Sequence, residues 1–351
     1  MVDAAAIQAA LAEKVELAVG GKLYSGWHSI SVTRALDALA GGFELALASR
    51  EQTGAARFEV RPDDACELRI AGETVITGWV DAVSSGGGAS EAVLRVSGRD
   101  KTGDLADCSA IHKPGTWRKA KIEAIAAALA APFGISVTAK ASTGAPVDKF
   151  ALQQGETIDS AIERLLRLRG LLKVAAPGGG MEIITPDEGA PIATLEHGVN
   201  ILSFEGTIDH RERFSDYIVK GQAAGNDRKN GKVVTQIRGE ARDAGVRRYR
   251  PKLIVAEEQG DGASLKTRAA WEAGVRAGRA TSLTLSVPGW RAGGQLWRPN
   301  VRARVKCAEG LIADQVMLVT EVTLTRDEAG TIAQLRLAPP GAWKQLAGGG
   351  R

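Results

Sequence analysis

Short runs in which apolar and polar residues alternate, separated by turns that contain glycine, constrain this chain most strongly. The run Val15–Val19 has the period of two that is typical of a strand with one buried face. Gly20-Gly21 follows directly, and paired glycines accept the positive φ angles that tight hairpin turns require. Similar runs lie at Ile30–Val32, Phe43–Leu47, Phe58–Val60, Glu67–Ala71, Thr74–Val80 and Ala92–Ser97. Short strands at this spacing predict a small barrel or sandwich over residues 15–108.

A local repeat favours the barrel. Lys22–Trp27 resembles Thr74–Trp79, because both place a hydroxyl residue, a glycine and a tryptophan after an apolar pair. A glycine inside a strand can mark a bulge or a barrel corner.

The character of the sequence changes between residues 109 and 200. Apolar residues at helical spacing predict a helix that begins near Ile122 and ends at Pro132 and Gly134. A second helix is expected after Thr157, since threonine caps helix N-termini, and it should end at Gly170. Two strand-like runs then flank a Pro-Gly-Gly-Gly turn, at Leu171–Ala175 and Met181–Thr185. This region is expected to form a small α+β module.

Strand patterns return over residues 201–343. The expected strands are Ile201–Ile208, Tyr217–Gly221, Lys252–Ala256, Leu283–Val287, Val301–Lys306, Gln315–Thr325 and Ala333–Leu337, with a helix from Ser264 to about Ala280. These strands indicate a second strand-rich region that carries a basic insert at about 222–262. Residues 1–14 would be an N-terminal extension and 344–351 a glycine-rich flexible tail. The predicted fold is α+β and β-rich, with an α+β module inserted between two strand-rich regions and with peripheral helices.

The segment Val93–Ser109 is predicted to be the corner between the first barrel and the module. Gly98 is expected to end a strand, and the Asp100 carboxylate to cap a short helical turn. Five charged residues crowd this corner, namely Arg99, Asp100, Lys101, Asp104 and Asp107. They are candidates either for a salt-bridged domain junction or for contacts that dock another chain. On the second interpretation, charge reversal at Asp100 and Asp104 would harm assembly more than folding.

The composition argues against several classes of function. The 45 Lys and Arg residues are nearly matched by 41 Asp and Glu, giving a net charge of +4, which does not indicate a nucleic-acid-binding protein. The three cysteines, Cys66, Cys108 and Cys307, lie far apart, so we expect no disulfide framework and synthesis in a reducing cytoplasm. No apolar run approaches the ~20 residues of a membrane helix. The Ala-rich start lacks the basic region of a signal peptide.

Motifs that carry chemistry are missing from the sequence. It has no phosphate-binding glycine loop, no dinucleotide fingerprint, no Cys-x-x-Cys pair and no two histidines spaced i,i+4. We therefore predict no cofactor, no metal, no catalytic residues and no enzymatic activity. A glycosidase stays open as an alternative, because its two carboxylates need no short signature.

Several blocks of the sequence resemble the baseplate hub proteins of Mu-like contractile-tailed phages. The two specific blocks are Gly98–Cys108 and Arg213–Gly221. Weaker ones are Leu23–Trp27, Ser31–Arg34, Gly42–Leu45, Gly155–Thr157, Trp297–Asn300 and Met317–Val319. The resemblance extends from about residue 15 to residue 343.

This resemblance implies a structural protein of the virion, made in the host cytoplasm and placed in the tail baseplate. It implies that each chain carries two small tube-type β-barrel domains, the second over residues 201–343. It further implies a homotrimer whose six barrels form a pseudo-six-fold ring between the six-fold tail tube and the three-fold central spike. The implied partners are further copies of the chain, the spike, tail-tube and tail-tip proteins, and baseplate wedge proteins. DNA would pass through an axial channel without specific binding. Because phosphate contacts would retain the duplex, we expect the basic residues of Arg228–Lys252 to face away from the channel.

One rival function involves the bacterial cell wall. The Gly155–Thr185 segment begins with Gly-Glu-Thr and could be a peptidoglycan-binding module similar to LysM. In that case the hub would bind the cell wall, or degrade it if unmarked carboxylates supplied an active site.

Overall fold

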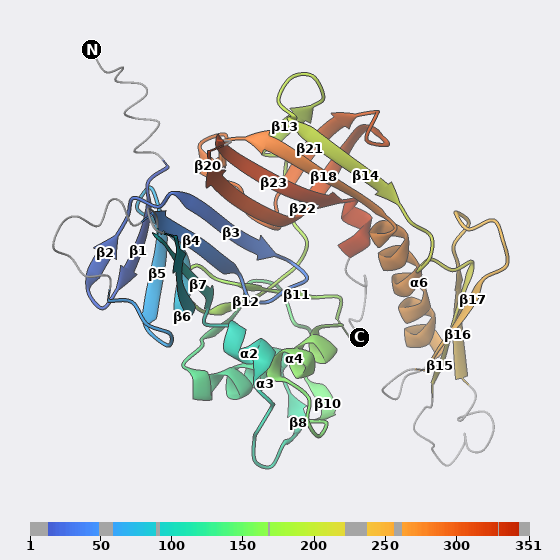
Figure 1. Cartoon of the computed structure of the whole chain (residues 1–351). Helices are drawn as coiled ribbons and strands as arrows, with labels where there is room; N and C mark the ends of the chain where they lie inside the picture. Colours follow the sequence, from blue (N-terminus) through green and yellow to red (C-terminus); the bar gives the residue numbers. More distant parts are fainter. Residues whose placement is uncertain are drawn as a thin grey trace.

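A sheet of thirteen strands, drawn from both ends of the chain, forms the centre of the molecule (Figure 1). The computed structural model describes residues 13–48, 59–88, 92–167, 169–221, 237–255, 262–328 and 330–343. The α+β module lies below the middle of the molecule in this view, and a smaller unit lies beyond helix α6 at the right (Figure 1). The β-rich α+β fold predicted from the sequence is confirmed.

The first barrel supplies seven strands to the sheet. They are β1 (Val15–Val19), β2 (Lys22–Tyr24), β3 (Ser29–Ala35), β4 (Gly42–Ala48), β5 (Ala65–Ile70), β6 (Glu73–Gly87) and β7 (Ala92–Asp100). Their order in space is β3-β4-β7-β6-β5-β1-β2. Gly20 and Gly21 have φ angles of 56° and 78°, so the hairpin predicted between β1 and β2 is confirmed.

Gly98 does not end a strand, contrary to the expectation from the sequence. It lies inside β7, where a Cβ atom would come within 2.3 Å of the Trp79 carbonyl and 2.7 Å of the Phe43 ring. The glycine is therefore required by close packing between strands and not by a turn.

The second barrel supplies the other six strands. They are β13 (Ala193–Glu196), β14 (Ser203–Ile208), β18 (Thr281–Pro288), β21 (Arg302–Cys307), β22 (Ile312–Asp327) and β23 (Gly330–Ala338). A small hairpin, β19 (Arg291–Ala292) with β20 (Gln295–Leu296), and the short helix η3 (Pro340–Trp343) complete this region. Strand β22 pairs antiparallel with β3, and this pairing joins the two barrels into one sheet.

The two barrels repeat the same strand order. Four neighbouring strands of the first barrel lie in the order β3-β4-β7-β6, and four of the second lie in the order β14-β18-β23-β22. Numbered along the chain within each group of four, both orders are first, second, fourth and third. The long third strand carries a bulge at the equivalent place in each barrel. The bulge lies between Val80 and Ala82 opposite β7, and between Val319 and Glu321 opposite β23. Both barrels share one hydrophobic core on the same side of the sheet.

The module has its own core of buried side chains. Its elements are α2 (Gly103–Asp107), β8 (Thr116–Ala120), α3 (Ile122–Ala130), η2 (Ala131–Phe133), β9 (Val137–Ala139), β10 (Val147–Ala151), α4 (Ile158–Arg167), β11 (Leu172–Ala175) and β12 (Met181–Ile184). The predicted ends of both helices are confirmed. Thr157 Oγ1 accepts a hydrogen bond from the Ser160 amide at 3.2 Å, and Gly134 follows η2 with φ 64°.

A separate three-stranded sheet occupies much of the region predicted to be a basic insert of the second barrel. It consists of β15 (Asp216–Gly221), β16 (Ile237–Arg242) and β17 (Pro251–Val255), and helix α6 (Gly262–Arg279) packs on it. Tyr217, Val219, Leu265 and Ala269 form its own small core. The sequence did not indicate this unit because its core joins strands and a helix about 50 residues apart along the chain. Residues 222–236 and 256–261 of the insert lie outside the described residues.

Candidate functional surfaces

One face of the central sheet is polar across both barrels. Apolar residues of the strands point to the shared core, so the alternate residues, which are mostly hydroxyl-bearing or charged, point to the opposite face. These residues are Ser31, Thr33, Glu44, Arg95, Ser97, Glu205, Thr207, Ser282, Thr284, Glu321, Thr323, Thr325, Gln334 and Arg336, and we call them the polar face.

The polar face is continuous where the barrels meet. Thr33 of β3 lies opposite Thr323 of β22, and their hydroxyl oxygens are 3.1 Å apart. Over the second barrel the face is hollowed by about 360 Å³. Arg336 and Glu321 in this hollow form an ion pair at 3.6 Å. The face carries three glutamates and two arginines, so it has no excess of positive charge.

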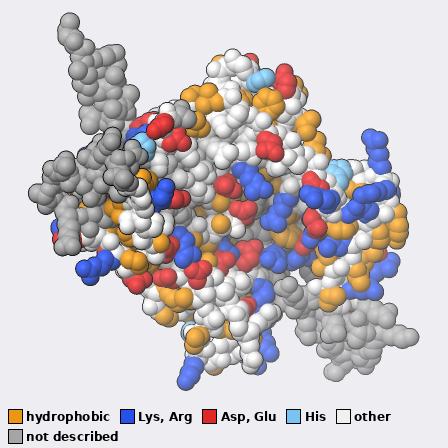
Figure 2. Space-filling view, viewed as in Figure 1, with side chains coloured by type: hydrophobic (Ala, Val, Ile, Leu, Met, Phe, Trp, Pro, Cys, Tyr) orange, Lys and Arg blue, Asp and Glu red, His pale blue; other side chains and the backbone are white. Residues whose placement is uncertain are grey.

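Basic residues gather elsewhere. Figure 2 shows Lys and Arg side chains, together with hydrophobic ones, over the β15–β17 unit. Tyr249, Leu253 and Val255 of this unit are exposed. The β15–β17 strands form a sheet separate from the one that bears the polar face.

The predicted corner residues lie near one another but do not form one site. Arg99 bridges two carboxylates, since its Nε is 2.8 Å from Asp81 and its Nη2 is 2.8 Å from Asp107. The hydrogen bond from Arg99 to Asp107 holds the pKa of Asp107 below its usual range. The stem of Lys101 lies beside Gly179 of the module. Among the described residues, the half-buried Asp104 carboxylate has no hydrogen-bond or ion-pair partner.

Asp100 is buried and serves the fold. Its carboxylate accepts hydrogen bonds from the Gly41 amide at 2.5 Å and the Thr102 amide at 2.9 Å, and also from the Thr102 hydroxyl. Burial raises the pKa of Asp100, and these hydrogen bonds partly oppose that effect. The predicted capping role is wrong in detail, because the carboxylate accepts from Thr102, which precedes α2, and not from an amide of the helix. Because Asp100 is buried, we now expect its reversal to harm folding as well as assembly.

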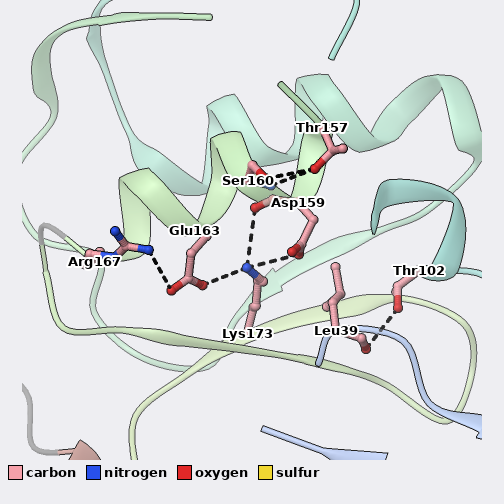
Figure 3. A network of polar contacts seen from close by, with 8 residues as sticks. All are labelled: Leu39, Thr102, Thr157, Asp159, Ser160, Glu163, Arg167 and Lys173. Atoms are coloured by element: carbon pink, nitrogen blue, oxygen red, sulfur yellow. Dashed lines mark hydrogen bonds and ion pairs between the residues drawn. The ribbon is translucent and has the colours of Figure 1, made fainter. Parts of the chain in front are cut away.

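Polar contacts hold the module to the sheet and its helix to its hairpin (Figure 3). Thr102 Oγ1 is 3.1 Å from the Leu39 carbonyl oxygen. Lys173 of β11 is buried and lies 3.0 Å from Asp159 and 2.7 Å from Glu163 of α4. Although burial alone would raise the pKa of Glu163, the ammonium group of Lys173 holds it below the usual value. Within the 155–185 segment, Asp159 and Glu163 thus hold α4 to β11 through Lys173.

A cavity of about 530 Å³ lies where the two barrels meet the β11–β12 hairpin. Arg34 of β3 lines it and donates to the Ala175 carbonyl at 3.0 Å. Burial lowers the pKa of the Arg34 guanidinium. On another side, the Asn300 amide group donates to the Thr185 carbonyl at 3.0 Å and accepts from the Asp187 amide at 2.9 Å. These contacts fix the module against both barrels.

The described residues contain no cluster of three or more His, Cys, Asp or Glu side chains that is placed to hold a metal ion. No helix in the same part of the chain is long and apolar enough to cross a membrane.

The sequence did not single out the polar face. Its residues are common polar ones, mostly Ser, Thr and Glu, distributed over seven strands, and only the pairing of those strands brings them together. The alternation within each strand was the available signal, and it could not show which strands are neighbours.

Family models of phage tail and baseplate proteins match the chain over four segments. Residues 14–100 match the Mu phage baseplate assembly protein GpP-like N-terminal family, and residues 102–185 match the second domain of the baseplate hub protein gp44-like family. Residues 213–270 match the third domain of the tail protein NMB1110-like family. Residues 262–345 match the fourth domain of Mu phage baseplate assembly protein GpP.

Three relatives align with nearly the whole chain. Baseplate hub protein gp44 of Escherichia phage Mu is 34% identical over 340 residues, covering 94% of this chain and 88% of that protein. The crystal structure of the 43 kDa tail protein of prophage MuSo2 from Shewanella oneidensis has 32% identity and a TM-score of 0.83, covering 95% of this chain and 100% of that one. A tail protein from Neisseria meningitidis MC58 has 26% identity and a TM-score of 0.80, covering 94% and 97%.

The two-barrel fold and these matches define a structural protein of the bacteriophage tail and baseplate. More specifically, the chain belongs to the gp44-like family of Mu-like baseplate hub proteins. The resemblance inferred from Gly98–Cys108 and Arg213–Gly221 is confirmed. A protein of this family has its place in the tail of the virion.

Proposed function

We propose that the chain acts as a homotrimeric baseplate hub that adapts the six-fold tail tube to the three-fold central spike. The observation that carries this proposal is the repeated barrel. Each chain presents two barrels with the same strand order, side by side in one sheet, so three chains around an axis present six similar units. One end of such a ring would match a six-fold tube, while the chain itself keeps three-fold symmetry for the spike.

We propose further that the polar face lines an axial channel for DNA. Hydroxyl groups interact with water and leave little charge to bind phosphates, whereas Lys and Arg release counterions from DNA and bind it tightly. The mixed charges of the polar face suit passage of DNA without retention. The basic β15–β17 unit would then face outward, towards wedge or other tail proteins.

In this proposal the corner residues Arg99, Lys101, Asp104 and Asp107 belong to the junction between the first barrel and the module. The two bridges made by Arg99 and the contact of Lys101 with Gly179 support that role. The proposed domains follow the sheets and cores, at about 14–100, 102–185, 213–280 and 281–343, with β13 and β14 completing the last barrel. The work of the protein would be assembly and not catalysis, and its relatives' names describe structural parts of tails.

Light scattering of the purified chain tests the trimer. The proposal predicts a particle of three times the 36.8 kDa of one chain, which binds the spike protein and the tail-tube protein together in one complex. A chain that stays monomeric at all concentrations, both alone and with the spike protein, would contradict the proposal.

A further inference from the structure

Among the strand edges of the central sheet that lack a partner strand within the described chain, two belong to the strands of the barrel repeat. Strand β14 pairs with β18 on one side only. In β6, the residues up to Trp79 pair with β5, but from Ala82 to Gly87 the strand pairs with β7 alone. Both free edges are exposed, and an exposed sheet edge is a template for pairing with another chain.

The repeat shows what would cover the β6 edge. Strand β22 is the counterpart of β6. Before its bulge, β6 pairs with β5 and β22 pairs with β21. After its bulge, β6 pairs with β7 and β22 pairs with β23. Past the bulge, the outer edge of β22 is occupied by β3. Strand β3 is the first strand of the other barrel, and β14 is its counterpart. The same contact made between chains would place β14 on the free edge of β6.

We propose that β6 of one copy pairs antiparallel with β14 of the next copy, repeating between chains the β22–β3 pairing within the chain. This proposal rests on the proposed trimer and assigns its interface. The direction is consistent, because the eight strands from β14 to β6 alternate, so an antiparallel closure continues the alternation. Each copy would contribute eight strands to one closed inner wall.

The bulges fix the register of this pairing. The bulged residues Asp81 and Thr320 are counterparts, and Thr207 is the counterpart of Thr33. Ser84 therefore corresponds to Thr323, three residues after the bulge. The observed pair of Thr323 with Thr33 would become a pair of Ser84 with Thr207 between two chains. A pair of hydroxyl residues would again lie on the polar face. One position along, Val83 would lie opposite Ile208, whose side chain is 54% exposed in the single chain. The interface would therefore bury an apolar side chain that otherwise faces water.

Small residues favour close approach at this edge. Ser84, Ser85 and Gly86 follow Val83, and no described strand other than β7 pairs with β6 between Ala82 and Gly87.

Disulfide trapping tests the pairing and its register. Ser84→Cys and Thr207→Cys are combined in a chain that also carries Cys108→Ser, so that no partly exposed native thiol remains. Directly opposed residues in antiparallel strands have Cα atoms ~4.5–5.5 Å apart, within the range that a disulfide spans. Within one chain six strands separate β14 from β6, so a disulfide between these positions must join two copies. Mild oxidation with diamide should give covalent dimers and trimers on a non-reducing gel, and dithiothreitol should reverse them.

The matched control is Ser85→Cys with Thr207→Cys. Ser85 points to the opposite side of the sheet from Ser84, so this pair should cross-link at least ten-fold less. The positions that receive a cysteine are exposed and Cys108 is partly exposed, and an unchanged thermal melt confirms that each variant folds. If the particle is a trimer and the control cross-links as well as the Ser84 pair, or neither does, the assigned edge is wrong while the trimer stands. If the protein is monomeric by light scattering, the proposed function itself fails.

Discussion

Replacing Asp100 by alanine should destabilise the protein without a direct effect on assembly. The carboxylate is 3% exposed and accepts from two buried backbone amides, those of Gly41 and Thr102. Each amide left without an acceptor costs about 1–3 kcal/mol. Removing a carboxylate whose pKa is raised by burial returns part of this cost. We expect a net loss of about 2–4 kcal/mol in the free energy of unfolding.

The assay is thermal unfolding followed by calorimetry, with Asp104→Ala as the matched control on the same corner. At about 2–4 °C per kcal/mol, Asp100→Ala should lower the melting temperature by roughly 4–16 °C. Asp104→Ala should change it by no more than about 1–2 °C, because its carboxylate has no partner to lose. Light scattering below the transition should show the same mass for both variants and for the unmodified protein.

The pH dependence of the stability provides a second test of the role of Asp100. The folded pKa of Asp100 is raised, so the folded state binds the proton more tightly than the unfolded state does. The contribution of this residue to stability therefore grows as the pH falls through the folded pKa towards the unfolded value of ~3.9. The gap in stability between the protein and Asp100→Ala should widen over that range. Equal stability of Asp100→Ala and Asp104→Ala, with loss of the trimer in the first alone, would refute this reasoning and make Asp100 an interface residue.

Three further predictions concern other parts of the chain. Asp243→Asn should lower the free energy of unfolding by about 2 kcal/mol at neutral pH, because it breaks a partly buried ion pair with Arg213. This pair lowers the pKa of Asp243, so the difference in stability between the protein and the variant, measured by denaturant unfolding, should vanish as the pH falls through that pKa. A difference that stays constant with pH would contradict the role of the pair. Lys173→Met should lower the stability of the module by about 1–3 kcal/mol, since it removes the buried ammonium group that pairs with Asp159 and Glu163; unchanged amide exchange in α4 would contradict this. Gly98→Ala should cost about 1–3 kcal/mol by overpacking, whereas Gly86→Ala, which meets open space, should be nearly neutral in the same melt; equal melts would show that the strands part easily.

Features set by neighbouring residues could be predicted from the sequence. Thr157 and Gly134 mark helix ends because capping depends on residues a few positions away. Strand alternation over Val15–Val19 gave the right buried face for the same reason. The family resemblance rested on two blocks whose residues now prove to lie at a domain junction and at the start of a small sheet.

Features set by distant residues could not be predicted. Thr33 and Thr323 meet across the barrels although 290 residues separate them, and no local pattern reports that pairing. Asp100 belongs to a run of charges that is typical of an exposed surface, but one of its hydrogen-bond donors, Gly41, lies 59 residues earlier. The family resemblance implied two barrels, but the strand-by-strand correspondence between them could not be predicted, because the counterparts share a bulge and a strand order while their side chains differ.

Electron cryo-microscopy of the purified hub bound to its spike protein tests whether the hub is a trimer whose polar face lines a channel. We expect three copies around one axis, six barrels at the end away from the spike, and an open channel whose wall contains Thr33, Thr323 and Ser97. A particle in which these residues face outward, or in which the β15–β17 unit lines the axis, would contradict it.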